Sequence, residues 1–248
     1  MSDFTIIIPA RYGSSRLPGK PLVPIAGKPL IVWVLERAQL LAPKDKIVVA
    51  TDDQRVAGAV ENAGFRAQIT PKDLTSGSDR VGWVAQKLSD DIIVNLQGDE
   101  PLIDTGAVHR AIRLMEEEPD MMAATLAFPL QEETEWRNPN VVKVLTDEKS
   151  NAIYFSRAAI PFFRDALFQS LPNLYKHQGI YLYRREFLLQ FIGWTPSALE
   201  NAEKLEQLRV LSHGYSLRVV PADEPSYGVD TAEDVSRITE IFKMKGMI

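Results

Sequence analysis

Residues 4–20 read FTIIIPARYGSSRLPGK, and the expected fold follows from the strand and loop in this segment. Its first five residues are apolar or β-branched and end at Pro9, which is typical of a short buried strand that runs into a loop. The loop contains two glycines and three basic residues. After it, apolar residues between Leu30 and Leu41 recur at three- and four-residue spacing, which predicts an amphipathic helix that stops before Pro43.

The alternation of strand and helix continues along the chain. Apolar runs at residues 46–51 and 91–96 predict two more strands, with a helix through Val56 and Val60 between them and another through Ile112 afterwards. Nearly continuous apolar strands that alternate with helices favour the α/β class, with a Rossmann-like, mostly parallel sheet covered on both faces. In such sheets ligands bind beyond the carboxyl ends of the strands.

From about residue 120 the alternation becomes looser. We interpret residues 1–248 as a single domain in which approximately residues 120–215 form a smaller lobe. The expected elements here are strands at 121–128, 141–145, 179–183 and 216–220, and helices at 202–212 and 231–242.

Composition excludes several classes of function. The chain has 248 residues, 45% of them hydrophobic, and no cysteine, so disulfides, thiolate metal sites and cysteine nucleophiles are excluded. A net charge of −5 argues against a general binder of nucleic acid or of anionic membranes. Apolar runs are too short to cross a bilayer, and the N-terminus lacks the pattern of an export signal, so we expect a cytoplasmic protein.

The loop after the first strand matches neither of two common phosphate-binding motifs. The dinucleotide motif needs three glycines, and the P-loop needs four residues between its glycines, whereas five separate Gly13 from Gly19. Small residues together with Arg11, Arg16 and Lys20 would suit a triphosphate. A solvated surface loop with proline turns explains the same charge and glycine content equally well.

Two acidic segments are candidate metal sites. Asp99 lies in NLQGDEP, directly after a predicted strand, where an oxygen ligand would suit Mg²⁺; an Asp-Glu-Pro turn is the plainer explanation. Asp230 precedes the last predicted helix, where Thr231 is a good N-cap and accounts for most of the segment without any chemistry. Similarly, residues 75–80 have the pattern of a capped helix start.

The string IPARYGSSRLPGKPL, residues 8–22, resembles the N-terminal signature of the sugar nucleotidyltransferases. Within that group the chain is most similar to the 3-deoxy-manno-octulosonate (KDO) cytidylyltransferases, also called CMP-KDO synthetases. The similarity extends from about residue 4 to residue 235. It implies the nucleotide-diphospho-sugar transferase fold, a homodimer, and in-line attack of a sugar's anomeric oxygen on the α-phosphate of CTP.

The resemblance also implies roles for particular residues. It assigns Arg11 and Lys20 to the phosphates, and it makes Asp99 and Asp230 the catalytic ligands of Mg²⁺. The remaining residues expected around the nucleotide are Ala10, Ser76, Gly77, Ser78, Arg80 and Gln97. The amide of Gln97 has both a donor and an acceptor with which to read a base edge.

Three later segments resemble the family's sugar-binding segments: YFSRAAIP at 154–161, HQGIYLYR at 177–184 and LEQLR at 205–209. A 2-keto-3-deoxy sugar acid presents one carboxylate and several hydroxyls. The residues expected to bind them are Arg157 for the carboxylate and His177, Tyr181, Glu206 and Gln207 for the hydroxyls. Taken singly, these are also ordinary residues: a core histidine, a half-buried tyrosine and two exposed helix positions.

The sequence therefore favours a CTP-dependent enzyme that activates KDO for lipopolysaccharide biosynthesis and releases pyrophosphate. The alternatives are a cytidylyltransferase for 8-amino-KDO or for sialic acid, and a non-catalytic nucleotide-binding module of the same fold. Leu182 and residues 162–175 depart from the family pattern, and we expect the sugar alternatives to differ there. A P-loop kinase is disfavoured by Pro21, which follows Lys20.

Overall fold

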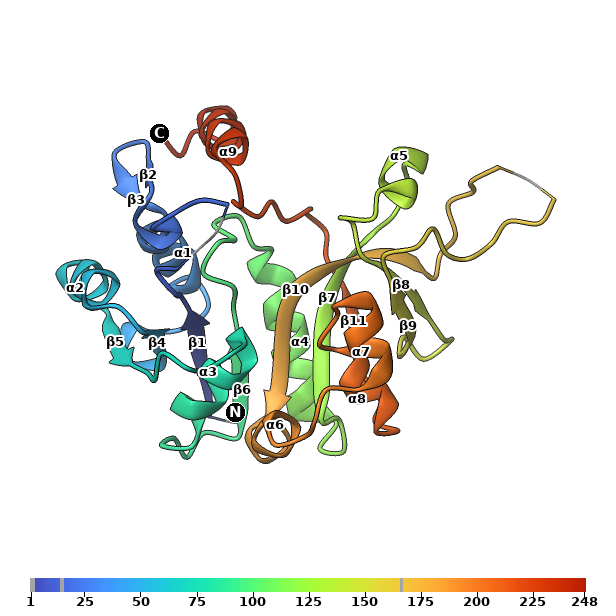
Figure 1. Ribbon diagram of the computed structural model, residues 1–248, viewed down its shortest axis with the longest axis horizontal. Helices are drawn as coiled ribbons and strands as arrows, with labels where there is room; N and C mark the ends of the chain where they lie inside the picture. Colours follow the sequence, from blue (N-terminus) through green and yellow to red (C-terminus); the bar gives the residue numbers. More distant parts are fainter. Residues whose placement is uncertain (1–2, 14–15, 166) are drawn as a thin grey trace. The chain divides into compact units, whose positions relative to one another are not determined.

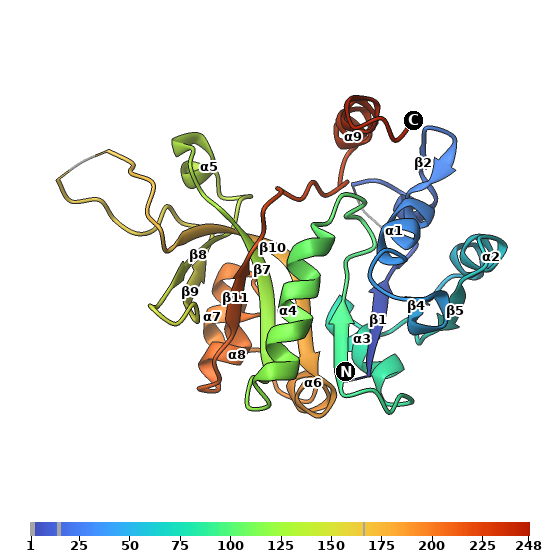
Figure 2. The same cartoon turned by 180° about the vertical axis from the view of Figure 1, so that it is seen from behind.

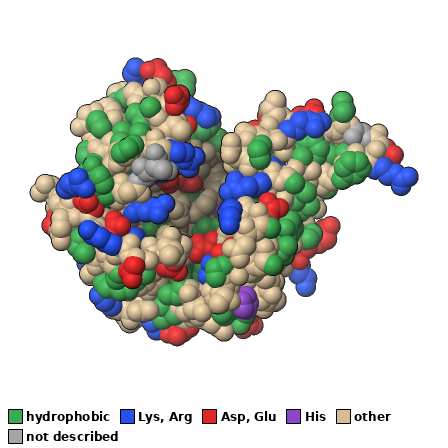
Figure 3. Space-filling model, in the orientation of Figure 1, with side chains coloured by type: hydrophobic (Ala, Val, Ile, Leu, Met, Phe, Trp, Pro, Cys, Tyr) green, Lys and Arg blue, Asp and Glu red, His purple; other side chains and the backbone are tan. Residues whose placement is uncertain are grey.

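The computed structural model describes residues 3–13, 16–165 and 167–248. The chain forms two compact units: the first comprises residues 3–105 together with Pro225–Ile248, and the second comprises Gly106–Glu224. In the part of the chain that is described, no helix is long and apolar enough to cross a membrane. On the face drawn in Figure 3, basic and acidic side chains are interspersed.

The first unit is built on a parallel sheet, as predicted. Its strands lie in the order β6-β1-β4-β5, and each neighbouring pair is parallel. Figure 1 shows helices beside these strands, including α1, α2 and α3. The elements are β1 (Phe4–Pro9), η1 (Lys20–Leu22), β2 (Pro24–Ile25), β3 (Lys28–Pro29), α1 (Leu30–Ala38), η2 (Lys44–Lys46), β4 (Ile47–Thr51), α2 (Gln54–Asn62), β5 (Arg66–Ile69), α3 (Gly77–Ala85), β6 (Ile92–Asn95) and α9 (Ala232–Met244).

Strand β1 occupies the position that matters most for a ligand. It pairs with β4 on one side and with β6 on the other, so the loops that follow β1 and β6 leave the same edge of the sheet. Residues Ile6, Ile7 and Ile8 are fully buried, which explains their unbroken apolar run. The order of the strands makes the carboxyl ends of β1 and β6 a switch point, where open α/β sheets bind their ligands.

The second unit contains a mixed sheet. Strand β7 pairs antiparallel with β10 and parallel with β11, while β8 pairs antiparallel with both β10 and β9. Seen from behind in Figure 2, α4 lies beside β7. The elements are α4 (Thr105–Glu117, which begins at the boundary), β7 (Ala123–Pro129), α5 (Glu133–Arg137), β8 (Lys143–Thr146), β9 (Ala152–Ser156), β10 (Leu174–Arg184), α6 (Arg185–Ile192), α7 (Ala198–Glu203), α8 (Leu208–Ser212) and β11 (Arg218–Pro221).

The predicted helix at residues 202–212 is wrong. The chain forms two short helices there, α7 and α8, and they are separated at Lys204, whose φ of 55° lies in the left-handed region. A non-glycine residue in that conformation cannot continue a right-handed helix. The first predicted helix is also shorter than expected: α1 ends at Ala38, because Leu40 and Leu41 donate to carbonyls three residues back and tighten the last turn.

Candidate active site

The phosphate loop begins where β1 ends. The Ala10 N–H donates to the carbonyl of Ala50 at 2.9 Å, which holds the loop against β4. Gly19 has a φ of 68°, and a Cβ there would lie 3.0 Å from the Tyr12 hydroxyl, so this position requires a glycine. Gly19 is the N-cap of the short helix η1, which begins at Lys20. Ser14 and Ser15 of this loop lie outside the described residues.

The loop after β6 approaches the phosphate loop closely. A Cβ on Gly98 would lie 2.8 Å from the Pro9 carbonyl oxygen, so only glycine allows the two backbones to come this near. Asp99 follows, and its side chain faces the same cavity as Lys20. The predicted strand, turn and carboxylate are therefore all present at the carboxyl edge of the sheet.

Asp230 reaches the site from the far end of the chain. It stands just before α9, where Thr231 is the N-cap and exchanges hydrogen bonds with Asp234 in a capping box. The predicted helix start is confirmed, and because Thr231 and Asp234 satisfy the cap, the side chain of Asp230 is not needed for it. Asp230 Oδ2 instead lies 2.9 Å from Arg16 Nη2.

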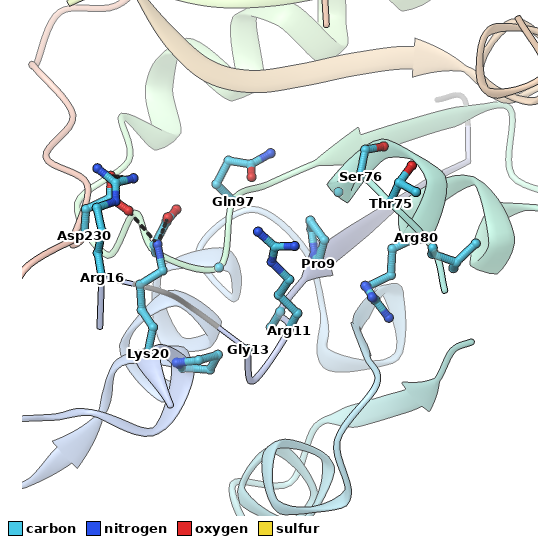
Figure 4. A pocket seen from close by; sticks show the side chains of 16 residues that line it. Pro9, Arg11, Gly13, Arg16, Lys20, Thr75, Ser76, Arg80, Gln97 and Asp230 are labelled. Atoms are coloured by element: carbon cyan, nitrogen blue, oxygen red, sulfur yellow. Dashed lines mark hydrogen bonds and ion pairs between the residues drawn. The ribbon is translucent and has the colours of Figure 1, made fainter. Parts of the chain in front are cut away.

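Lys20 joins the two predicted metal ligands. Its Nζ donates to Asp99 Oδ2 at 2.5 Å and to Asp230 Oδ1 at 2.9 Å, as the dashed lines in Figure 4 show. Burial by itself would lower the pKa of Lys20, but the two carboxylates outweigh that effect and raise the pKa above its ordinary value. The ammonium group therefore remains charged and neutralises part of the charge of the carboxylate pair.

These residues line one cavity of about 340 Å³, and all of its walls belong to the first unit. Figure 4 shows Arg11, Lys20, Gln97 and Asp230 around it. The cavity brings together nine of the predicted residues, namely Ala10, Arg11, Lys20, Ser76, Gly77, Arg80, Gln97, Asp99 and Asp230. Ala10 is buried, with 5% of its surface exposed.

A divalent cation fits the donor set, provided that a substrate supplies further oxygens. Among the described residues, no cluster of three or more histidine, aspartate or glutamate side chains is arranged to hold a metal. Asp99 and Asp230 give two carboxylates bridged by one ammonium group. Mg²⁺ is commonly bound by one or two carboxylates together with water and substrate phosphates, so the pair suits Mg²⁺ and would not form a closed protein cage.

Helix α3 forms another wall of the cavity. Ser76 caps this helix, and its hydroxyl accepts from the Asp79 N–H at 3.0 Å. Arg80, only 2% exposed, donates from Nη2 to Asp52 Oδ2 at 3.3 Å. Ser78 is 3% exposed and does not line the cavity, so its predicted contact with the nucleotide stays a prediction.

Two acidic residues beside this cavity were not predicted from the sequence. Asp52 follows β4 and accepts from the Tyr12 N–H at 3.4 Å, which connects the phosphate loop to Arg80. Glu100 accepts from the Ser226 hydroxyl at 2.6 Å. Burial, and next the charge of the neighbouring Asp99, raise the pKa of Glu100 to about 7. A polar residue at the carboxyl end of β4 was a usable signal for Asp52, whereas the Glu100 contact joins segments too far apart to foresee.

The five predicted sugar residues lie in the second unit. On β10, the rings of His177 and Tyr181 have their centroids 5.4 Å apart. His177 Nε2 is 2.9 Å from Thr125 Oγ1, and burial lowers the pKa of the imidazole to about 3. The histidine is therefore neutral near pH 7 and has a defined orientation.

The other three sugar residues lie where β9 ends and α8 begins. Arg157 donates from Nε to the Glu203 carbonyl at 2.9 Å and from Nη1 to the Pro139 carbonyl at 3.2 Å. Glu206 and Gln207 immediately precede α8. Gln207 is 3% exposed rather than an exposed helix position, and its Nε2 has no hydrogen-bond partner among the described residues. Buried amides are nearly always paired, so this donor is suited to a ligand or a water.

The two segments that depart from the family pattern lie in different surroundings. Leu182 is fully buried, and the alternation along β10 places it on the opposite face from Tyr181 and Tyr183, whose rings stack at 5.8 Å. Leu182 therefore does not share a face with Tyr181, the predicted sugar residue next to it on β10. In the loop before β10, Phe163 and Phe168 pack against Trp136.

The parallel sheet and the cation-rich cavity with two carboxylates define a nucleotidyltransferase of the α/β class. The model of the cytidylyltransferase family matches residues 5–219. A 3-deoxy-manno-octulosonate cytidylyltransferase of Syntrophotalea carbinolica is 48% identical over 95% of this chain and 97% of its own length. The enzyme of the same name from Geotalea daltonii is 46% identical, over 98% and 99%.

Solved structures agree with these sequence similarities. A structure of CMP:2-keto-3-deoxy-manno-octonic acid synthetase complexed with CTP is 41% identical, with a TM-score of 0.92 over 98% of this chain and 100% of that one. A cytidylyltransferase from Leptospira borgpetersenii, 18% identical with a TM-score of 0.66, covers 98% of this chain and 88% of its own, and shares the fold. The chain belongs to the cytidylyltransferase family, and within it to the 3-deoxy-manno-octulosonate cytidylyltransferases.

Proposed function

We propose that this protein transfers CMP from CTP to the anomeric oxygen of 3-deoxy-manno-octulosonate and releases pyrophosphate. The observation that carries the proposal is the cavity in which Lys20 joins Asp99 to Asp230. Three segments far apart in the sequence meet there and place two carboxylates beside several cations. The similarity of the whole chain to enzymes of that name supplies the sugar.

The reaction needs no covalent enzyme intermediate. The sugar's anomeric oxygen forms a bond to the α-phosphorus of CTP, and the bond from that phosphorus to the pyrophosphate oxygen breaks. The proton of the anomeric hydroxyl passes to water. Negative charge increases on the leaving pyrophosphate, so cations placed beforehand stabilise the transition state. Arg11 and Lys20 are the residues that we assign to this role.

We assign the metal site to Asp99 and Asp230, with Mg²⁺ as the ion. When bound, Mg²⁺ would neutralise charge on the phosphoryl group being transferred. Lys20 holds both carboxylates in the structure described here, so its ammonium group would exchange them for phosphate oxygens as CTP enters. The carboxylates are then free to act as ligands.

We propose that the second unit holds the sugar acid, as expected for the lobe at about residues 120–215. The guanidinium of Arg157 has Nη2 without a partner among the described residues, so a carboxylate can pair with it. The orphan Nε2 of Gln207 and the neutral imidazole of His177 suit sugar hydroxyls. Tyr181 and Glu206 complete the predicted set.

A pyrophosphate-release assay tests this function. CTP and Mg²⁺ are supplied with KDO, 8-amino-KDO or sialic acid in turn, and Asp99→Asn serves as the inactive control. We expect release with KDO to exceed release with the other two sugars. Fastest release with 8-amino-KDO or with sialic acid would identify that sugar as the substrate. No release with any sugar would favour a non-catalytic nucleotide-binding module.

We also propose that the protein is a cytoplasmic homodimer whose product serves lipopolysaccharide biosynthesis. Cytoplasmic CTP is the required co-substrate. The loop between β9 and β10 exposes Phe162 and Leu167, at 86% and 75%, which suits burial against a second copy. Sedimentation equilibrium of the wild type and of Phe162→Ser/Leu167→Ser tests the dimer: the wild type should have twice the mass of the chain, and a monomeric wild type would refute it.

A further inference from the structure

A buried lysine lies beneath the predicted carboxylate-binding arginine. Lys143 begins β8, and its side chain is fully buried. Its Nζ donates three hydrogen bonds: to the carbonyl of Asn138 at 2.9 Å, of Val141 at 2.7 Å and of Arg157 at 2.7 Å. An ammonium group has three donors, so all of them are used on backbone oxygens.

The three carbonyls belong to two segments that both support Arg157. One is the backbone of Arg157 itself, just after β9. The other is the turn at residues 138–141, which also contains Pro139, and the Pro139 carbonyl accepts from Arg157 Nη1 at 3.2 Å. Lys143 therefore fixes the backbone from which the Arg157 side chain extends, and also the turn on which its guanidinium rests.

We infer that Lys143 is a positioning residue for the sugar-acid carboxylate, because it sets the place of the Arg157 guanidinium without touching the substrate. This inference rests on the proposed function, since it takes Arg157 as the group that pairs with the carboxylate. A buried ammonium group is costly unless every donor is paired. A bidentate ion pair between a guanidinium and a carboxylate is sensitive to small displacements of either group. A shift of the turn at residues 138–141 would therefore weaken binding of the sugar acid.

The side chain of Arg157 shows why this support matters. Its Nε is already bound to the Glu203 carbonyl at 2.9 Å, and its backbone N–H donates to Glu203 Oε2 at 2.9 Å. Together with the Pro139 contact, these bonds leave Nη2 and one hydrogen of Nη1 for a ligand. If the turn at 138–141 moves, the guanidinium loses one of the two contacts that orient it.

The test compares the KM for the sugar with the KM for CTP. Lys143→Met keeps the length of the side chain and removes its donors, and Lys143→Gln keeps two donors on a shorter chain. We expect the KM for KDO to rise about 10-fold in Lys143→Met and less in Lys143→Gln, as for loss of a charged hydrogen-bonding partner. The KM for CTP should change less than about 2-fold in both, because the nucleotide residues lie in the other unit.

A double variant shows whether Lys143 acts through Arg157. Arg157→Met should raise the KM for KDO at least as much as Lys143→Met does. In the double variant the KM should equal that of Arg157→Met, because the lysine would have nothing left to position. Lys46→Met is the control: this lysine pairs with Asp3 and Asp90 and should leave both KM values unchanged.

Each outcome decides one question. Multiplying effects in the double variant, or equal rises in both KM values, would overturn the positioning role. A lower melting temperature in Lys143→Met and Lys143→Gln with an unchanged KM for KDO would overturn it too, since Lys143 would then serve stability alone. A wild-type protein that does not turn over KDO would refute the proposed function itself. The pyrophosphate-release assay of the wild type with the three sugars identifies that outcome.

Discussion

Lys20 Nζ lies 2.5 Å from Asp99 Oδ2, although 79 residues separate the two along the chain. The same nitrogen also donates to Asp230, so the ammonium group lies between the two carboxylates. A metal ion bound by both carboxylates would occupy the same position. A lysine in this place reduces the electrostatic repulsion between the two carboxylates. Lys20 and a divalent ion therefore compete for the same oxygens.

The competition predicts how Lys20→Met behaves. In the absence of CTP, this variant should bind Mn²⁺ several-fold more tightly than the wild type, because no ammonium group occupies the carboxylates. Turnover should nevertheless fall about 100-fold or more, since a phosphate-binding cation is lost. Electron paramagnetic resonance titration of Mn²⁺ measures the first effect. Lys28→Met, which removes a lysine paired with Glu36, is the control. Equal or weaker Mn²⁺ binding in Lys20→Met would show that Lys20 does not compete with the ion.

Arg80 should contribute both to stability and to binding of CTP. Arg80→Ala leaves Asp52 without its ion-pair partner in a largely buried place, so we expect a loss of about 3–5 kcal/mol in the free energy of unfolding. The KM for CTP should also rise. Arg113→Ala removes an exposed ion pair with Glu117 and should cost less than about 0.5 kcal/mol in urea denaturation. Similar losses in the two variants would be evidence against the buried pair.

Gly98 tests the close approach of the two loops. In Gly98→Ala the new methyl group would lie 2.8 Å from the Pro9 carbonyl, so the loops must separate at a cost of about 1–3 kcal/mol. We expect lower turnover as well, since Asp99 is the next residue. Gly58→Ala, in helix α2 with open space around it, should instead stabilise the protein by about 0.5–1 kcal/mol. A stable, fully active Gly98→Ala enzyme would refute the tight contact.

His177 should make stability depend on pH. Its folded pKa of about 3 is lower than the value of about 6.5 in an unfolded chain, so only the unfolded chain gains a proton between these values. The contribution of His177 to the free energy of unfolding is therefore complete above about pH 6.5. It decreases as the pH falls from 6.5 towards 3, by up to about 2 kcal/mol at pH 5. Urea denaturation at pH 7 and pH 5 measures the loss.

Two substitutions isolate the contribution of this imidazole. His177→Asn should lack that part of the acid sensitivity, whereas substitution of the exposed His109 by Asn should retain it. The same pH dependence in the wild type and in His177→Asn would show that the imidazole is not kept neutral by the fold.

The sequence predicted the parallel half of the fold well, because its signals are local. Strand β1 is a run of isoleucines that are fully buried, and Thr231 caps the last helix as expected. The glycines after β1 and β6, and the carboxylate of Asp99, could be located for the same reason. The end of a parallel strand is recognisable in the sequence, and ligands bind beyond the carboxyl ends of such strands.

The sequence could not predict contacts that depend on the tertiary structure. Helical spacing continued through residues 202–212, yet Lys204 breaks the helix and brings Gln207 into a buried place. Lys143 lies inside the strand predicted at 141–145, where no local signal indicates its three carbonyl partners, which come from a turn and from the residue after β9. Strands β5 and β9 went unpredicted, since their exposed faces weaken the apolar pattern.

Transfer of CMP to the sugar can be followed on the phosphorus atoms of substrate and products. CTP, KDO and Mg²⁺ are incubated with the wild-type protein, and the products are observed by phosphorus NMR. We predict that the phosphodiester signal of CMP joined to the sugar and the signal of pyrophosphate increase in equal amounts, and that both are absent with Asp230→Asn. Pyrophosphate accompanied by free CMP, or an Asp230→Asn variant that reacts at the wild-type rate, would contradict this prediction.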